Sequence, residues 1–346
     1  MLNKLLLSAV LLVGLLNVTP AVSQRADGGM IAFYNLENLF DTIDTPNVRD
    51  TEFTPAGKKA WNSERYWKKV SSVAAVIKRM ATREGVKGPA VLGLCEVENK
   101  QVVVDLVNDP QLKALNYQIV HYDSPDKRGI DVCLVYQPDC FEVSNSRAVP
   151  LMIYDAQDGD RIHTRDQLVV SGLFAGEPMH FIVNHWPSRW GGEERSRPLR
   201  IEAAKVSRSI IDSILVTDAK AKVMLMGDLN DDPINESVTE HLHAKENKRQ
   251  VKKGDLFNPL QEYFSKGEGS LAYKGKWNLF DQIIFTKSVL KKGKGNYKYK
   301  HSGIYDEQDI RVAEGPYKGY PFRTYVGSNY HGGYSDHFPV YIMLVR

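Results

Sequence analysis

The chain has 346 residues, of which 42% are hydrophobic and 25% charged, and its formal net charge is +3. These values fit a soluble globular protein with a substantial core, and the weak charge neither requires nor excludes nucleic acid as a partner. Three cysteines cannot all pair within the chain, so we expect neither a disulfide framework nor a cysteine-based metal site. A Cys133–Cys140 link across a hairpin is conceivable.

The N-terminus has the pattern of a secretory signal over residues 1–23. Lys4 supplies the positive charge, residues 5–16 the apolar segment, and residues 21–23 a small-residue cleavage site. The apolar segment is too short to span a bilayer comfortably, and no cysteine follows for a lipid anchor. We therefore expect an exported protein, secreted or periplasmic, without a stable membrane span. Residues 24–346 contain no repeats and no linker, which predicts one domain.

Short apolar runs bounded by turn formers predict buried strands, and apolar residues at helical spacing predict amphipathic helices. In chain order, we expect strands at 30–34, 91–95, 117–122, 130–136, 141–153, 167–174, 179–183, 222–225, 279–285 and 338–345. Helices are expected at 64–80, 101–107 and 199–214. The apolar stripe of the first helix includes Trp67 and is interpreted as core packing.

The strand that begins at Lys222 ends in a Gly-Asp-Leu-Asn motif over residues 227–230. We expect Gly227 to let the backbone bend at the strand end, where a side chain would crowd the turn. Asp228 and Asn230 then leave the sheet in its first irregular residues, where functional side chains commonly lie. Taken alone, the motif fits an Asx turn equally well.

Polar side chains of this kind recur at the ends of, or within, six strand-like runs. The set comprises Asn35, Glu96, His185, Asp228 with Asn230, Asp281, and Asp336 with His337. Each could be a turn cap or a salt-bridged acid, because a buried carboxylate is costly unless it is paired or bound to metal. One shared site explains all six runs. Carboxylate and amide oxygens suit Mg²⁺ or Mn²⁺, and no His/Cys spacing indicates structural zinc.

An ordered series of motifs resembles the endonuclease/exonuclease/phosphatase superfamily, which has the deoxyribonuclease-I-like fold, and most resembles a secreted bacterial-type member. The motifs are Tyr-Asn-Leu-Glu-Asn at 34–38, Cys-Glu-Val-Glu at 95–98, Arg-Gly-Ile-Asp at 128–131, Asn-His-Trp-Pro at 184–187, Gly-Asp-Leu-Asn at 227–230, Asp-Gln at 281–282 and Ser-Asp-His at 335–337. The resemblance covers residues 30–346 and implies an α/β fold. That fold is a four-layer α/β/β/α sandwich, in which two mixed sheets pack face to face with helices outside.

The resemblance also implies a metal site and a group that acts on water. Glu96 corresponds to the principal metal ligand, supported by Asn35 and Asp336. Asp228 and Asn230 correspond to the pair that orients or deprotonates the attacking water. The implied cofactor is Mg²⁺ or Mn²⁺, with Ca²⁺ as a further option, and one or two ions could bind.

The remaining roles implied by the resemblance concern the substrate's phosphate. His337 would contact the scissile phosphate, while Asp281 would fix its tautomer and stabilise its positive charge. His185 would contact phosphate or assist the leaving oxygen. Arg128 and Arg189 lie beside matched motifs and could each clamp phosphate oxygens or form a surface ion pair.

These inferences predict a secreted, metal-dependent phosphoester hydrolase, assumed to be a monomer, with nucleic acid as the favoured substrate. The alternatives are a phospholipid or sphingomyelin phosphodiesterase, a phosphomonoesterase of inositol or sugar phosphates, and an inactive binding module on the same fold. Two basic stretches, 245–253 and 287–300, could track a polyanion if they flank the site. Otherwise they are solvated loops.

Overall fold

The structure is a computed structural model that describes residues 28–155, 159–291 and 296–346. The expected signal at 1–23 lies outside the described residues, so it stays a prediction. No helix in the described ranges is long and apolar enough to cross a membrane. Cys95, Cys133 and Cys140 are all free thiols, so the conceivable link between the last two is not formed.

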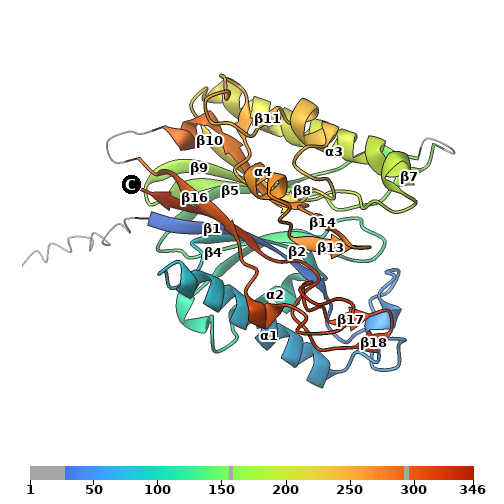
Figure 1. Ribbon diagram of the computed structural model, residues 1–346. Coiled ribbons are helices and arrows are strands. Elements are labelled where there is room, and N and C mark those ends of the chain that lie inside the picture. Colours follow the sequence, from blue (N-terminus) through green and yellow to red (C-terminus); the bar gives the residue numbers. More distant parts are fainter. Residues whose placement is uncertain (1–27, 156–158, 292–295) are drawn as a thin grey trace, which may run out of the picture.

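Two mixed sheets pack face to face, with helices on their outer sides (Figure 1). The six-stranded sheet has the order β16 (Lys298–Ile304), β19 (Val340–Val345), β1 (Gly28–Leu39), β2 (Val91–Val97), β4 (Asp131–Tyr136), β3 (Gln118–His121). The seven-stranded sheet has the order β11 (Ala244–Lys245), β12 (Leu256–Phe257), β15 (Asp281–Thr286), β10 (Lys222–Asp228), β9 (Glu177–His185), β8 (Gln167–Phe174), β5 (Phe141–Val149). The predicted four-layer α/β/β/α sandwich is confirmed.

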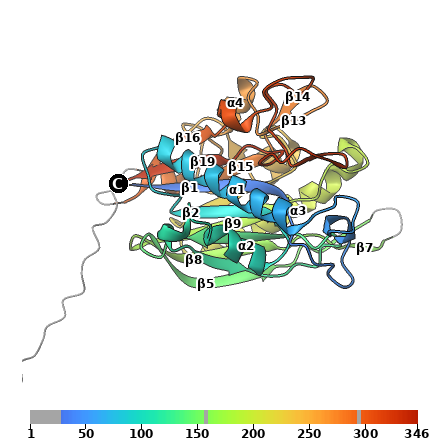
Figure 2. The same cartoon turned by 90° about the horizontal axis from the view of Figure 1, so that it is seen from below.

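Helices α1 (Ser63–Arg83) and α2 (Lys100–Val107) cover the six-stranded sheet, and α3 (Glu193–Thr217) lies outside the seven-stranded sheet (Figures 1 and 2). Short hairpins and helices complete the fold: β6 (Ile153–Tyr154) with β7 (Arg161–Ile162), β13 (Leu271–Tyr273) with β14 (Lys276–Asn278), β17 (Tyr325–Val326) with β18 (Asn329–Tyr330), and α4 (Gln261–Ser265). Single turns of helix lie at η1 (Thr51–Phe53), η2 (Lys113–Leu115), η3 (Ser237–His241), η4 (Lys287–Leu290) and η5 (Gln308–Ile310).

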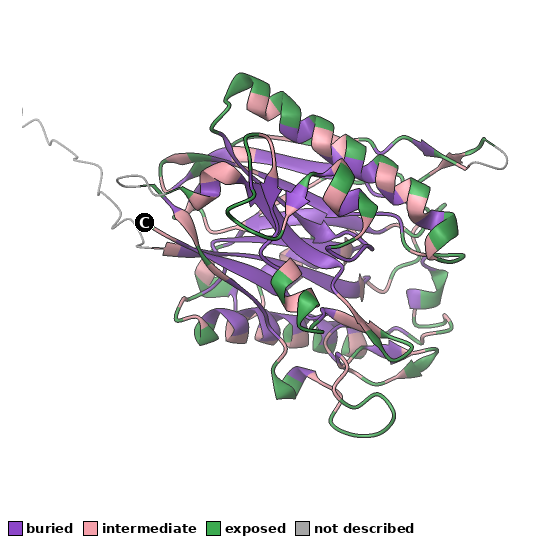
Figure 3. Ribbon diagram, turned by 45° about the horizontal axis from the view of Figure 1, so that its top comes forward, coloured by how far each residue is buried: buried purple, intermediate pink, exposed green. Residues whose placement is uncertain are grey.

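Each long helix buries one side, while most strands in the two sheets are buried along much of their length (Figure 3). In α1 the buried side includes Val70, Val73 and Ile77, as the apolar spacing predicts. The assignment of Trp67 to this side is wrong, because its side chain is 53% exposed. Tyr66 takes the buried position instead, and its hydroxyl donates a hydrogen bond to Asp105 at 2.6 Å.

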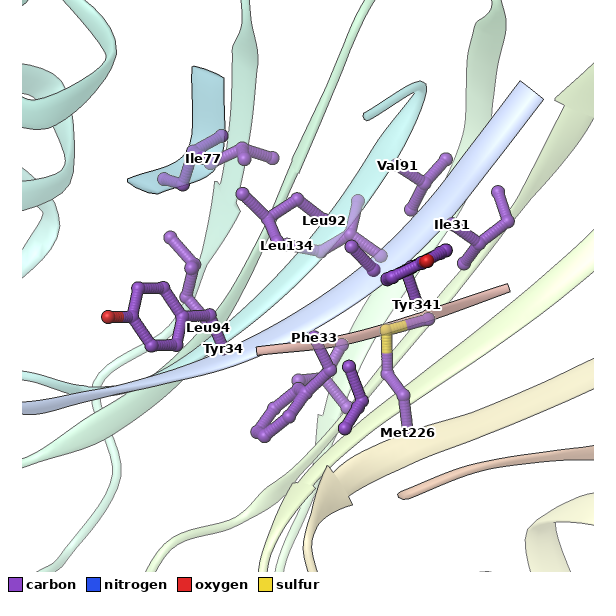
Figure 4. Close-up of a cluster of buried hydrophobic side chains, with 14 of the residues drawn as sticks. Ile31, Phe33, Tyr34, Ile77, Val91, Leu92, Leu94, Leu134, Met226 and Tyr341 are labelled. Carbon is purple, nitrogen blue, oxygen red and sulfur yellow. The ribbon is translucent and has the colours of Figure 1, made fainter. Parts of the chain in front are cut away.

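Side chains from both sheets fill the interior between them. Phe33 and Tyr341 of the six-stranded sheet lie near Met226 of β10 (Figure 4). At Gly93 of β2, a Cβ atom would lie 2.6 Å from the Met226 sulfur, so glycine permits this close approach of the two sheets. The core therefore joins the two sheets tightly and fixes how their ends align.

The register of the strands brings the predicted site residues to one end of the two sheets. In the parallel pair β1 and β2, Asn35 lies opposite Cys95, the residue before Glu96. Asp228 lies opposite His185 in the parallel pair β10 and β9, and opposite Asp281 in the antiparallel pair β10 and β15. The β13–β14 and β17–β18 hairpins lie toward this end of the molecule, away from the C-terminus (Figure 1).

Gly227 serves a different purpose from the one that the sequence suggests. The residue lies inside β10 and has no left-handed backbone conformation, so it does not bend the strand end. A Cβ atom at this position would lie 2.4 Å from the Asn184 carbonyl oxygen of β9. Glycine is therefore required for the close pairing of β9 and β10 beside Asp228.

The close contact between Gly227 and Asn184 predicts that a methyl group at position 227 destabilises the protein. Gly227→Ala should lower the free energy of unfolding by about 1–3 kcal/mol, because the packed backbone of β9 must move to make room for the methyl group. Urea unfolding measures the change. Val216, which is 87% exposed on α3, gives the control Val216→Ala, expected to stay within about 0.5 kcal/mol of the unmodified protein. Equal stability of the two variants would contradict the prediction.

Candidate active site

Asp228 lies at the centre of the polar side chains at this end of the sheets. Its Oδ2 accepts a hydrogen bond from Asn35 Nδ2 at 3.0 Å, and its Oδ1 accepts one from the Asn230 backbone N–H at 2.9 Å. The Nε2 atoms of His185 and His337 lie 3.7 and 3.9 Å from Asp228 Oδ2. Burial raises the pKa of Asp228 to about 7, although the neighbouring His337 acts in the opposite direction. A carboxylate with a pKa near neutrality is suited to accepting a proton from water.

His337 is held by a buried carboxylate on the neighbouring sheet. Its Nδ1 lies 2.6 Å from Asp281 Oδ2, and Ser270 Oγ donates a hydrogen bond to the same oxygen at 2.5 Å. Burial disfavours charge on His337, but Asp281, Asp228 and Asp336 outweigh it and raise the pKa of the imidazole well above its usual value. The arrangement therefore presents a cationic imidazole, with Nε2 directed toward Asp228.

In both Glu96 and Asp336, one carboxylate oxygen accepts a hydrogen bond and the other lies near a histidine of the site. Glu96 is a bulged residue of β2 in the left-handed conformation, at φ +58. Its Oε2 accepts a hydrogen bond from the Asn38 N–H at 2.9 Å, and its Oε1 lies 3.9 Å from His185 Nε2. Asp336 Oδ2 accepts one from Arg323 at 2.7 Å, while its Oδ1 lies 3.9 Å from His337 Nε2.

These oxygens fit a hard divalent cation. Glu96 and Asp336 provide carboxylates. The Asn35 amide oxygen accepts a hydrogen bond from the Glu37 N–H at 2.9 Å, and a carbonyl oxygen keeps a second lone pair for a ligand. The three predicted ligands thus supply an oxygen-rich set beside Asp228.

A second grouping of possible metal ligands lies next to this set and shares no residue with it. Ligand atoms of Asp228, Asp281 and His337 lie within 4.8 Å of one another. The Oδ2 of Asp281 is already engaged by His337 and Ser270, so we interpret this group as a hydrogen-bonded relay. The metal would lie on the side of Glu96 and Asp336.

His185 is buried at the end of β9 and differs electrostatically from His337. Burial is the main reason that its pKa lies well below the usual value, and Arg165 and Arg128 act in the same direction. The ring is therefore neutral near pH 7 and can donate a hydrogen bond without adding positive charge. The two histidines are thus suited to different tasks.

A sequence profile of the endonuclease/exonuclease/phosphatase family matches residues 30–346. The chain belongs to this family. Membership makes it a phosphoester hydrolase, and a divalent metal is typical of the fold. Among curated protein sequences, none matches the chain.

Several solved structures share the fold. They include a mannosyl-6-phosphatase of Bacteroides thetaiotaomicron (TM-score 0.55, 15% identity, covering 92% of this chain and 99% of that one). Another is TDP2 of D. rerio in complex with a single-stranded DNA product (TM-score 0.53, 13% identity, 92% and 99% covered). A third is a family protein from Bacteroides thetaiotaomicron (TM-score 0.56, 15% identity, 92% and 98% covered). At these identities the likeness shows the fold alone.

In this family member, a network of charged residues that the sequence did not reveal supports the site. Arg323 bridges Asp336 and Glu37, with its Nε 3.3 Å from a Glu37 carboxylate oxygen. The buried amine of Lys69 lies 3.6 Å from Glu37 and donates hydrogen bonds to Thr324 Oγ1 and the Tyr334 carbonyl. Glu37 is therefore engaged by cations and is not available to the metal. No motif marks Arg323 or Lys69.

Arg165 is a second supporting residue that the sequence analysis missed. Its guanidinium donates hydrogen bonds to the carbonyls of His185 and Trp186 and pairs with Asp126 at 2.9 Å. It thereby fixes the end of β9, from which His185 projects. Arg165 lies in an irregular segment without any recognisable pattern, so only the three-dimensional arrangement reveals it.

The two candidate phosphate clamps differ sharply in their surroundings. Arg189 donates hydrogen bonds to the Asn230 carbonyl and to the side chains of Asp231, Asp232 and Asn235. These contacts fit the ion-pair alternative, and we do not retain Arg189 as a phosphate clamp. The Arg128 side chain is 45% exposed, and its Nε lies 3.8 Å from Asp126, so it stays a candidate.

The two basic stretches do not flank the site. The strand after residues 245–253 pairs with Phe285 and Thr286, at the end of β15 away from Asp281. In the second stretch, Lys298 pairs with Val345, at the far end of β19 from His337. Residues 292–295 lie outside the described residues. The described parts of these stretches are therefore too far from the site to guide a polyanion into it.

The contacts around Asp228 predict how two substitutions combine. Asp228→Ala and His337→Ala should each lower kcat by roughly 10²- to 10⁴-fold, because a proton acceptor and a positioning group are removed. Since the two act as one unit, the double variant should lose much less than the product of the two effects. Steady-state rates of the three variants give the comparison. Asp139→Ala, at an exposed turn, is the control, and multiplicative losses would place the two residues in separate sites.

Proposed function

We propose that this chain hydrolyses a phosphate ester by attack of water, assisted by Mg²⁺ or Mn²⁺, with Ca²⁺ as a further option. The observation that supports this most is the meeting of polar groups from five other strand-like runs around Asp228. Glu96, Asp336 and Asn35 would hold the ion. When bound, a divalent ion stabilises charge on phosphoryl oxygens and lowers the pKa of bound water.

The chain's own residues would bind the phosphate and move the proton. Asp228 would accept a proton from the attacking water, aided by its pKa of about 7. The His337 imidazolium would donate a hydrogen bond to a phosphate oxygen, while Asp281 keeps the ring in place. Preorganised donors of this kind stabilise charge that develops in the transition state. Asn230 would help to position the water through its contact with Asp228.

His185 would contact the phosphate rather than protonate the leaving oxygen. Its Nε2 faces Glu96 and Asp228, and its lowered pKa leaves little of the protonated form near pH 7. Of the two roles implied by the family resemblance, this environment favours the hydrogen-bond donor. Slow hydrolysis by His185→Ala with both good and poor leaving groups would support that choice.

The substrate is the open part of this proposal. The basic stretches support nucleic acid only if they flank the site, and their position removes that support. The fold relatives do not choose either, since one is named a mannosyl-6-phosphatase and another was solved with single-stranded DNA. We retain nucleic acid as the first candidate substrate. Phospholipid, sphingomyelin, inositol phosphate and sugar phosphate substrates are the alternatives.

The expected cellular context is part of the same proposal. Residues 1–23 carry a pattern typical of a cleaved secretory signal, and residues 24–346 would then act outside the cytoplasm as a single domain. We also propose that the protein acts as a monomer. Cleavage can be read from the N-terminal residue of the exported protein.

Metal dependence is the direct test of the chemistry. Hydrolysis of an activated phosphodiester should vanish with EDTA and return with Mg²⁺ or Mn²⁺. Glu96→Gln keeps the shape of the side chain but weakens the ligand, so activity should require a higher metal concentration. Full activity in chelator, or an unchanged metal titration for Glu96→Gln, would refute the metal assignment. A panel of the candidate esters under the same conditions then identifies the substrate.

The two arginines predict opposite phenotypes. Arg128→Ala should raise KM several-fold without loss of stability, because its guanidinium is 45% exposed and its 3.8 Å contact with Asp126 leaves donors for phosphate. Arg189→Ala should instead lower the free energy of unfolding by about 1–3 kcal/mol, because the Asn230 carbonyl and Asp232 Oδ2 each lose a hydrogen-bond donor. Thermal unfolding and steady-state kinetics of both variants separate these effects. A raised KM with unchanged stability for Arg189→Ala would restore its role as a clamp.

A further inference from the structure

A pocket of about 600 Å³ is lined in part by Asp336, one of the three candidate metal ligands. Arg323, which contacts Asp336, also lines the pocket. The remaining walls come from the β13–β14 hairpin and from the segment 312–331, and they are mainly aromatic or apolar: Tyr273, Pro316, Tyr317, Tyr320, Pro321 and Phe322. We call this feature the tyrosine pocket. Its size is typical of small-molecule sites.

Hydrogen bonds hold the walls of the tyrosine pocket in place. The Val312 N–H donates to the Tyr320 carbonyl at 2.8 Å, and the Phe322 N–H donates to the Ile310 carbonyl at 2.9 Å. The hydroxyl of Tyr320 accepts a hydrogen bond from the Gly275 N–H at 3.0 Å, which ties the segment to the β13–β14 hairpin. The two walls are therefore fixed to one another before any ligand arrives. Preorganisation of this kind lowers the entropic cost of binding.

Arg323 links the tyrosine pocket to the candidate active site. Its Nη2 donates to Asp336 Oδ2 at 2.7 Å, and the other oxygen of Asp336 lies 3.9 Å from His337 Nε2. A phosphate held by His337 would thus have the pocket at its side. The group esterified to that phosphate is the part of a substrate that can enter the pocket.

The chemistry of the walls favours a flat aromatic group. Tyr273 and Tyr317 are 63% and 51% exposed, which leaves ring surface available for stacking. The Tyr317 and Tyr320 rings lie 5.9 Å apart at an interplanar angle of 48°, so they form two differently inclined surfaces. Lys274 and His331 also line the pocket and offer polar atoms to the edge of a heteroaromatic ring.

We infer that the tyrosine pocket binds the nucleobase of a nucleotide ester whose phosphate lies at the metal site. This inference rests on the proposed function, because it takes the phosphate to be held by His337 and the metal ligands. It narrows the substrate to esters that carry an aromatic heterocycle close to the phosphate. It does not require a long polyanion, in keeping with the distant position of the basic stretches.

Calorimetric titration of the full chain in Mg²⁺ tests this inference without turnover. The probes are three phosphonates in which carbon replaces the bridging ester oxygen, so that none can be hydrolysed. One carries thymidine, one carries deoxyribose without a base, and one carries mannose. The thymidine compound should bind roughly 5- to 150-fold more tightly than the compound without a base.

Substitutions then locate the base. Tyr317→Leu and Tyr273→Leu should each weaken binding of the thymidine compound and leave the baseless compound unchanged. Tyr122→Leu is the control, because Tyr122 is 41% exposed, does not line the pocket and directly follows β3, an edge strand of the six-stranded sheet. Unaltered unfolding temperatures confirm that the variants are folded. Equal affinities for the thymidine and baseless compounds, or insensitivity to both tyrosine substitutions, would overturn the inference.

The remaining outcomes separate this inference from the proposed function. Tightest binding of the mannose compound would overturn the nucleobase assignment and leave phosphoester hydrolysis standing. Base-dependent binding that both tyrosine substitutions weaken would support the inference. If the same protein hydrolysed no ester with Mg²⁺ or Mn²⁺, the proposed function would fall while the binding result stood.

Discussion

The site depends on the register of β10 between its two neighbours. Asp228 faces His185 across a parallel pairing and Asp281 across an antiparallel pairing, so one strand aligns groups on both sides. A slip of one residue would turn Asp228 to the opposite face of the sheet. The glycine contact with Asn184 and the packing of Met226 against Gly93 both resist such a slip. Backbone pairing therefore determines which side chains meet at the site.

Charge balance is the second constraint on this end of the molecule. The buried carboxylates of Asp228 and Asp281 are offset by the His337 imidazolium, and Glu37 is offset by Lys69 and Arg323. Buried charges are tolerated only when they are paired or bound to metal. Among the described residues, the one potentially cationic side chain within 4 Å of the Glu96 carboxylate is His185, and its ring is neutral near pH 7. A divalent ion there would complete the balance, which is an independent reason to place it beside Glu96.

Much of the architecture and the set of central residues could be predicted from sequence, because both follow from local patterns. Polar residues such as Asn35 interrupt apolar runs, and the ordered motifs gave the fold and the family. Local sequence patterns do not decide which of several neighbours a residue meets. Trp67 fits the apolar spacing of α1, yet Tyr66 takes the buried position. Arg189 follows a motif but is engaged by acids that lie more than 40 residues away in sequence. The positions of the two basic stretches depend on how the edge strands pair, and no local sequence pattern encodes that pairing.

One thiol lies within the framework of the site. Cys95 directly precedes the bulge at Glu96, is fully buried and unpaired, and burial raises the pKa of its thiol well above the usual value. An inaccessible and protonated thiol reacts slowly with oxidants and alkylating agents. Its labelling therefore requires β2 to separate from β1 or β4, which would also displace Glu96. The rate at which Cys95 is alkylated in native conditions would therefore report how often the sheet opens at its metal-binding end.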